Sequence, residues 1–329
     1  MKKRMVLILM ILVCLTTGVF QFHKVMALAD RRSINYKAEM VNLIDGMHSY
    51  AKKENPDFLF ISNNGLGIFS AGDGLESSCA DRALASIDGI LMEDYFYGWD
   101  MRDNNPTPKD EQNYRLELLQ RPKEKKLPIF NIDYCSTREY RERSYKKNRE
   151  AGFVGFVAEH RQLDSIPGQI KDENAADCRT LQDVKNYLVL LNPEQFKSKE
   201  AYLSALKNTN YDLLIIDMMY NGEPLSPQDV LSLKIKGNGA KRLVVSYMSV
   251  GEAENYRSYW KPEWDKAHPD WIDAENGDWE GNFKVKYWMQ QWHQILYGTK
   301  DSYLDQLLQQ GFDGAFLDVV DAYEYFAVK

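Results

Sequence analysis

Two apolar segments, one near each end of the chain, finish in carboxylates. The first reads GILMEDYFYG over 89–98, and the second reads GFDGAFLDVVDAY over 311–323. A continuous apolar run is typical of a parallel strand that is covered on both faces. A charged group at the end of such a strand is costly to bury without a function. We therefore expect Glu93 and Asp318 to be the catalytic pair of one shared site.

A pair of carboxyl groups on either side of a bond is the machinery of glycoside hydrolysis. We assign Asp318 as the nucleophile or base, and Glu93, with its apolar neighbours, as the general acid. The separation of the two groups would indicate the stereochemistry. A distance of about 5 Å predicts retention of the anomeric configuration, and roughly 6.5–9.5 Å predicts inversion.

Other chemistries find less support in the sequence. Divalent metals also bind clustered acids, but the chain has only five His and contains no HxH or DxDxDG pattern. A Ser-His-Asp hydrolase is also disfavoured, because the sequence contains no GxSxG motif. The net charge of −7 argues against a nucleic-acid partner. We expect no metal and no cofactor. A non-catalytic carbohydrate-binding barrel and a metal-dependent hydrolase of another polymer remain as alternatives.

Helix-like and strand-like segments alternate from residue 36 onward. The expected strands are 58–65, 89–98, 128–135, 152–160, 186–193, 211–219, 241–254 and 311–323. The expected helices are 36–55, 79–87, 110–121, 137–150, 198–208, 226–236 and 301–310. Eight such units predict an α/β fold, a (β/α)8 TIM barrel, as a single domain over 34–329. The alternative is an open doubly wound sheet, but no GxGxxG turn or P-loop marks one. We expect the first helix to pack beside the last strand.

Polar side chains follow the ends of most of the expected strands. In a (β/α)8 barrel the chemistry lies at the C-terminal ends of the strands, so these residues read as functional. The predicted substrate-binding residues of this kind are Asn64, Asp94, Asp133, Asp217, Tyr247, Glu252 and Asp321. For any one of the acids, a salt bridge at the rim or a helix cap is the alternative.

Six of the seven Trp fall between 260 and 292, among Tyr, Asp, Glu, Asn and Lys. Sugar sites combine aromatic faces with polar groups in this way. We expect about half of these rings to pack the segment onto the barrel. Trp260 and Trp288 are the rings that we expect to contact a ligand.

Residues 1–29 have the order of a secretory signal. Three basic residues at 2–4 precede an apolar run over 5–20, and Ala27-Leu28-Ala29 offers small residues for cleavage. The alternative is an uncleaved membrane anchor. We therefore expect a secreted, extracellular protein, a monomer, with membrane contact only through such an anchor. Its acidic surface would attract partly deacetylated amino sugars, whose ammonium groups would pair with Asp217 or Glu252.

Export would leave Cys79, Cys135 and Cys178, which are too few for a disulfide framework. The sequence allows at most one bridge and does not say which two cysteines would form it.

Four motifs resemble the endo-α-1,4-polygalactosaminidase-like family of extracellular glycoside hydrolases. They are YDLLIIDMM, RLVVSYMSVGEAENYRSYW, KVKYWMQQW and GFDGAFLDVVDAYEYF. Segments of the N-terminal half, such as IDGILMEDYFYG, look like the later strands of that family, so the motifs stand in cyclically permuted order. The resemblance implies a (β/α)8 barrel, two catalytic carboxylates that match Asp318 and Glu93, and endo-cleavage of a galactosamine-type polysaccharide. Many relatives read Trp-Asp-Pro where this chain has Trp288-Met289-Gln290.

Overall fold

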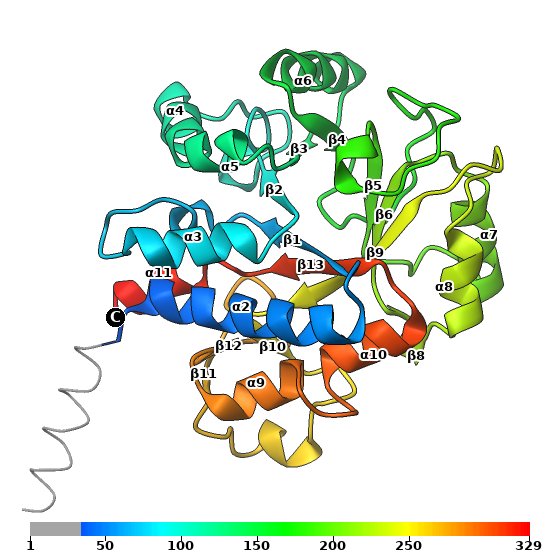
Figure 1. Ribbon diagram of the computed structural model, residues 1–329. Coiled ribbons are helices and arrows are strands. Elements are labelled where there is room, and N and C mark those ends of the chain that lie inside the picture. Colours follow the sequence, from blue (N-terminus) through cyan, green and yellow to red (C-terminus); the bar gives the residue numbers. More distant parts are fainter. Residues whose placement is uncertain (1–33) are drawn as a thin grey trace, which may run out of the picture.

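Eight strands pair side by side in one sheet, and every pairing between them is parallel. They appear in a computed structural model that describes residues 34–329 (Figure 1). The strands are β1 (Leu59–Asn63), β2 (Gly89–Glu93), β3 (Ile129–Tyr134), β4 (Val154–Ala158), β5 (Tyr187–Leu190), β6 (Leu213–Ile216), β9 (Leu243–Ser249) and β13 (Gly314–Asp318). Their order is β4-β3-β2-β1-β13-β9-β6-β5, which forms a nearly closed barrel. The predicted (β/α)8 TIM barrel is confirmed.

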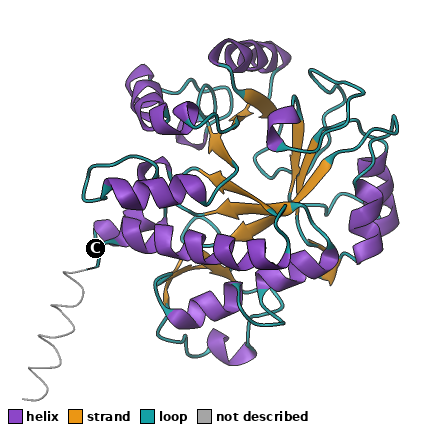
Figure 2. Ribbon diagram, in the orientation of Figure 1, coloured by secondary structure: helices purple, strands orange, loops and turns teal. Residues whose placement is uncertain are grey.

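Helices surround the strands as an outer layer (Figure 2). They are α2 (Tyr36–Glu54), α3 (Ser77–Ala85), α4 (Lys109–Leu118), α5 (Gln120–Glu124), α6 (Arg138–Ala151), α7 (Lys199–Lys207), α8 (Pro227–Leu233), α10 (Tyr303–Gln310) and α11 (Ala322–Ala327). One gap interrupts this layer. Between β4 and β5, residues 159–186 are irregular except for a short 3-10 turn, η3 (Leu181–Asp183).

The first helix takes the place of a helix that follows the last strand. The side chain of Asn35 caps α2 by accepting a hydrogen bond from the backbone N–H of Ala38. One face of α2, with Met40, Leu43 and Met47, is buried. The helix packs against α10 and α11, which flank β13, and its start lies near the C-terminus (Figure 1). The expected neighbourhood of the first helix and the last strand is confirmed.

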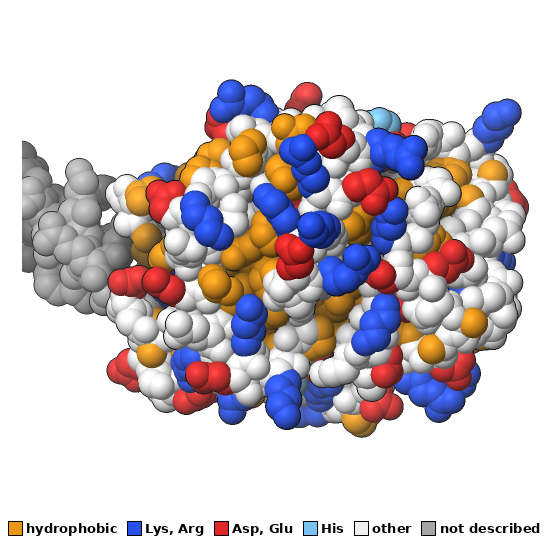
Figure 3. Space-filling model, turned by 90° about the horizontal axis from the view of Figure 1, so that it is seen from above, with side chains coloured by type: hydrophobic (Ala, Val, Ile, Leu, Met, Phe, Trp, Pro, Cys, Tyr) orange, Lys and Arg blue, Asp and Glu red, His pale blue; other side chains and the backbone are white. Residues whose placement is uncertain are grey.

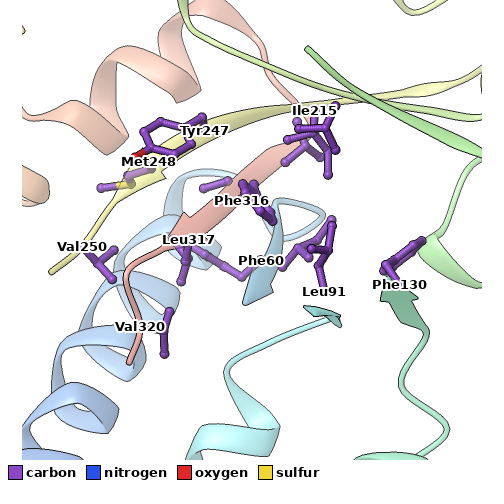
Figure 4. Packing of buried hydrophobic residues seen from close by; sticks show 14 of the residues in the cluster. Phe60, Leu91, Phe130, Ile215, Tyr247, Met248, Val250, Phe316, Leu317 and Val320 are labelled. Carbon is purple, nitrogen blue, oxygen red and sulfur yellow. The ribbon is translucent and has the colours of Figure 1, made fainter. Parts of the chain in front are cut away.

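Large apolar side chains fill the barrel and the space between strands and helices. Ile61 of β1, Phe316 of β13 and Tyr247 of β9 lie in register across three neighbouring strands. Figure 4 shows how Leu91 and Phe316 lie within this packing. Because successive side chains of a strand point to opposite faces, this register also fixes which polar residues face the barrel interior.

A small antiparallel sheet follows β9 and interrupts the βα alternation. Its strands are β10 (Glu252–Glu254), β12 (Asn282–Val285) and β11 (Ile272–Glu275), and α9 (Gln290–Leu296) follows them (Figure 1). A two-residue pair, β7 (Met219–Tyr220) with β8 (Glu223–Pro224), follows β6. The sequence pattern predicted one strand over 241–254, whereas the chain breaks after β9 and starts β10 in a different sheet.

Among the helices of residues 34–329, none is long and apolar enough to cross a bilayer. The expected leader, residues 1–29, lies outside the described residues. Cys79, Cys135 and Cys178 are buried free thiols.

Candidate active site

Three adjacent strands deliver the centre of the site. Glu93 ends β2, Asp318 ends β13, and Asn63 ends β1 between them. The side-chain nitrogen of Asn63 donates one hydrogen bond to Oε1 of Glu93 at 2.8 Å and one to Oδ1 of Asp318 at 2.7 Å. The structure therefore brings together the two carboxylates that the sequence pointed to, and it adds Asn63, which was not among the predicted site residues.

Each of these strands ends abruptly after its site residue. Asn64, Asp94 and Val319 have φ angles of 51°, 56° and 59°, in the left-handed region. This conformation is strained for a β-branched residue such as Val319 and persists only where the surroundings enforce it. Two of the turns also hold the acids, because Oδ1 of Asn64 accepts from the N–H of Glu93 (3.2 Å) and the N–H of Val319 donates to Oδ1 of Asp318 (2.9 Å).

Glu93 is held by two further groups that were not predicted. The hydroxyl of Tyr134, at the end of β3, donates to Oε2 of Glu93 at 2.6 Å. The guanidinium of Arg115 donates to the backbone carbonyl of Glu93 at 2.7 Å. Both carboxylate oxygens of Glu93 thus have a protein donor, so its orientation is fixed before any ligand arrives.

Burial, followed by the charge of the nearby Glu93, raises the pKa of Asp318 to about 6. Hydrogen bonds from Asn63, Val319 and Tyr247 act in the opposite direction. Burial, followed by the charge of Asp318, also raises the pKa of Asp321 to about 7. A cluster of this kind retains a proton more readily than an isolated carboxylate, as acid–base catalysis at a shared site requires.

Asp94 lies on the other side of Glu93. Burial raises the pKa of Asp94 to about 7, although Arg161, with Nη1 3.5 Å from Oδ2, acts to lower it. The second oxygen, Oδ1, is buried without a hydrogen-bond partner among the described residues. An unpartnered acceptor beside the two bridged acids is suited to receive a donor from a ligand.

Asp133 does not reach the site, which corrects its prediction as a substrate ligand. Its carboxylate is fully buried and accepts hydrogen bonds from the N–H groups of Phe96 and Tyr97 and from Ser144 and Asn148 of α6. Side chains alternate along β3, so Tyr134 points toward Glu93 while Asp133 points outward toward α6. The strand end was located correctly, but the residue that faces the interior is the next one.

Two other predicted ligands are occupied by ion pairs. Asp217 pairs with Arg257 at 2.8 Å, and the same guanidinium lies 2.6 Å from Glu254. Glu252 is buried and pairs with Lys284 at 3.0 Å. The expectation that Asp217 or Glu252 is spare for an ammonium group is therefore not supported. Tyr247 is buried beside the site, and its side chain acts to lower the pKa of Asp318.

The predicted aromatic contacts are also engaged elsewhere. Trp260 stacks on Phe283 with ring centroids 4.9 Å apart, and Trp288 packs at 4.7 Å against Phe326. Both rings are half-buried in the packing of the small sheet and α11. Among the aromatic residues of this segment, Tyr256 and Trp279 are the exposed ones.

A cavity of about 760 Å³ lies away from the acids. Residues at the starts of β3 and β4 line it, together with parts of α5, α6 and the irregular 172–185 segment. Figure 3, which looks onto the side of the molecule that carries α6, shows apolar side chains at the centre of this face among charged ones. This cavity lacks the carboxylate pair.

In the part of the chain that the structure describes, no group of three or more His, Cys, Asp or Glu is arranged to hold a metal ion.

Comparison with known proteins adds independent support from the C-terminal half. The model of the glycoside-hydrolase family GH114 matches residues 190–328, which include β6, β9 and β13 and therefore Asp318. This match supports a glycoside hydrolase. It does not extend to β1 and β2, so the predicted cyclic permutation and the role of Glu93 stay predictions.

Similar proteins occur in distant microorganisms. An uncharacterized protein of Methanocaldococcus jannaschii is 38% identical over 157 residues, 47% of this chain and 42% of the relative. One of Thermotoga maritima is 30% identical over 46% of each chain, and one of Deinococcus radiodurans is 34% identical over 38% of each. The chain thus spans less than half the length of each of these relatives.

Proposed function

We propose that this protein is a secreted glycoside hydrolase that cuts within an amino-sugar polysaccharide of the galactosamine type. The observation that carries the proposal is the bridge that Asn63 makes between Glu93 and Asp318. This bridge holds two carboxylates close together at the C-terminal ends of barrel strands, and a close pair of carboxylates is what glycoside hydrolysis requires. The family match over residues 190–328 and the resemblance of the motifs support the same reaction class.

In the proposed reaction, Glu93 donates a proton to the glycosidic oxygen as that oxygen leaves the anomeric carbon. An oxygen of Asp318 attacks the same carbon and forms a covalent glycosyl ester. Glu93, now ionised, takes a proton from water, whose oxygen displaces Asp318 and regenerates both groups. A pKa of about 6 leaves Asp318 mostly ionised at neutral pH, as a nucleophile must be.

The substrate contacts that we propose lie around this pair. Asp321 and Asp94 are half-buried beside it and have raised pKa values, so an ammonium group of the substrate would stabilise their ionised forms. Tyr247 and Asn64 position the acids and border the same space. The net charge of −7 favours a cationic or neutral polymer over a polyuronate.

We also propose that the protein acts outside the cell as a monomer. The support for export is the order of basic, apolar and small residues over 1–29.

Product analysis by mass spectrometry on a panel of bacterial exopolysaccharides tests the function. The panel should contain partly deacetylated α-1,4-galactosamine polymers, their fully N-acetylated forms and a polyuronate. Wild-type protein is expected to release oligosaccharides from the first, and Asp318→Asn and Glu93→Gln to lose this activity by more than tenfold. Full activity in both variants would reject the pair. Binding of a polymer without release of any product would indicate a carbohydrate-binding barrel instead.

A further inference from the structure

Two aromatic rings of the Trp-rich segment that follows β9 are largely exposed. Tyr256 is 56% exposed and Trp279 is 52% exposed. The neighbouring rings of the same segment behave differently, since Trp271 stacks on Trp292 at 5.2 Å and Trp260 stacks on Phe283 at 4.9 Å. The segment therefore divides into a packed aromatic cluster and two rings turned to solvent.

These two rings stand on abutting turns. The antiparallel pairing of β10 with β12 brings Glu254 opposite Asn282. Just beyond this pair, the N–H of Asn255 donates to the carbonyl of Gly281 at 2.9 Å. Tyr256 follows Asn255 directly, and Trp279 precedes Gly281 by two residues, so both residues lie at the same end of the small sheet.

Arg257 lies between this end of the small sheet and the strand next to Asp318. Its guanidinium carbon lies 5.3 Å from the ring centroid of Tyr256 and 5.6 Å from that of Tyr247. Tyr247 belongs to β9, which pairs with β13 and so lies beside the strand that ends in Asp318. The hydroxyl of Tyr256 donates to Oε1 of Glu254 at 2.7 Å, and Glu254 pairs with Arg257. Tyr256 is thus held in a fixed orientation while most of its surface stays open.

We propose that Tyr256 and Trp279 form a second binding site, which holds sugar rings of the polymer beyond the bond that is cut. The proposal rests on the proposed function, because it takes the polysaccharide as the ligand. Exposed aromatic faces offer apolar surface to the C–H faces of sugar rings. Asn255, Asp278 and Glu280 are exposed next to them and supply acceptors for hydroxyl or ammonium groups, the mixture found at carbohydrate sites.

This second site predicts a dependence on chain length. A disaccharide occupies only the space at Glu93 and Asp318, whereas a long oligomer also covers Tyr256 and Trp279. Removing either ring is therefore expected to weaken the binding of long oligomers but not of the disaccharide. The Kd for long oligomers should rise by up to about tenfold, which corresponds to the free energy of one aromatic contact.

The test measures binding separately from catalysis. Asp318→Asn protein is titrated calorimetrically with a disaccharide and with long oligomers of partly deacetylated α-1,4-galactosamine. Trp279→Ala and Tyr256→Ala are added singly, and Tyr256→Phe shows whether the ring or its hydroxyl matters. Leu231→Ala, at an exposed apolar residue of α8, is the matched control and should change nothing. Thermal melting of each variant confirms that it is folded.

The outcomes separate this proposal from the proposed function. If wild-type protein releases product but Trp279→Ala binds long oligomers as tightly as its parent, the second site is wrong and the hydrolase stands. If no product forms but Trp279→Ala weakens the binding of long oligomers only, the second binding site is supported and the proposed hydrolase activity is wrong. Equal weakening of short and long ligands, or no binding of either by the parent, overturns the second site.

Discussion

Glu93 and Asp318 accept hydrogen bonds from the same atom, the side-chain nitrogen of Asn63, at 2.8 and 2.7 Å. The two accepting oxygens therefore lie no farther apart than the sum of these lengths, about 5.5 Å, which is shorter than the roughly 6.5–9.5 Å separation of inverting glycosidases. An amide nitrogen has two protons, and each is used on one acid. The first strand of the barrel thus fixes the distance between residues of the second and the last.

Replacing Asn63 with Ala should uncouple the two acids. Without the bridge, both carboxylates lose a donor and move apart to reduce their repulsion. We expect kcat on the cleaved polymer to fall by about 100-fold, since small misplacements at a reacting centre cost this much. Steady-state kinetics measure this, with Asn42→Ala on the outer surface as the control. A loss confined to KM would contradict a positioning role for Asn63.

The spacing of Glu93 and Asp318 predicts retention of the anomeric configuration. Oxygens within about 5.5 Å leave too little room for a water between carboxylate and sugar. Proton NMR spectra recorded in the first minutes of hydrolysis should show the anomer of the substrate linkage before mutarotation. Initial appearance of the opposite anomer would show that a water, not Asp318, attacks.

Replacing Asp318 with Asn should stabilise the fold at neutral pH. The pKa of Asp318 is about 6 in the folded protein, against about 3.9 for an unperturbed Asp. Between these values the folded state binds more protons than the unfolded state, so wild-type stability falls as pH rises. Asp318→Asn cannot ionise at this position and does not lose stability in this way. Its free energy of unfolding should therefore exceed that of wild type by an amount that grows from pH 4 to pH 7, to on the order of 2 kcal/mol.

Urea denaturation at pH 4 and pH 7 measures this difference. Asp183→Asn is the control with the opposite sign, because hydrogen bonds from the backbone of Arg179 and Thr180 lower the pKa of Asp183. Asp183→Asn should therefore lower the free energy of unfolding more at pH 7 than at pH 4. An advantage of Asp318→Asn that does not change with pH would refute the assigned pKa.

Asp133→Ala should damage the fold rather than the chemistry. The substitution leaves the N–H groups of Phe96 and Tyr97 and the side chains of Ser144 and Asn148 without their buried acceptor. We expect the free energy of unfolding to fall by about 3 kcal/mol or more. Activity per folded molecule should stay within threefold of wild type. Normal stability with lost activity would restore Asp133 as a substrate ligand.

Arg257→Met should also destabilise the protein strongly. It leaves Glu254, whose side chain is 2% exposed, and Asp217 without their shared cation. Removing one partner of a buried ion pair costs about 3–5 kcal/mol. The control is Arg82→Met, which breaks an exposed pair with Asp45 at 3.4 Å and should cost less than about 1 kcal/mol. Similar melting temperatures for the two variants would contradict the structural role of Arg257.

Periodicity and apolar runs predicted the barrel well, because both depend on local sequence. All eight strands lie within the expected ranges, and Glu93 and Asp318 stand at strand ends as expected. The small antiparallel sheet was missed. Its strands are short, and β10 begins only three residues after the end of β9, so the pattern was taken for one continuous strand.

The roles of individual polar residues were harder to predict, since they depend on which way each side chain points and on what meets it. Asp133 and Tyr134 are neighbours in sequence, but the pleat of β3 sends one to α6 and the other to Glu93. Asp217 and Glu252 were expected to be available for a ligand, whereas each forms a salt bridge with a cation that is distant in sequence, Arg257 and Lys284 respectively. Trp260 and Trp288 were predicted to contact a ligand, and the structure shows both rings half-buried against Phe283 and Phe326.

The sequence by itself determined the number and order of the βα units and the two acids at their ends, because hydrophobic burial requires a pattern that can be read along the chain. Tertiary structure alone decided that Asn63 bridges those acids. Residues 63, 93 and 318 meet only because closing the barrel places β1 between β2 and β13. No local signal carries that relationship, since a hydrogen bond between side chains depends on distances that exist only after the sheet has formed.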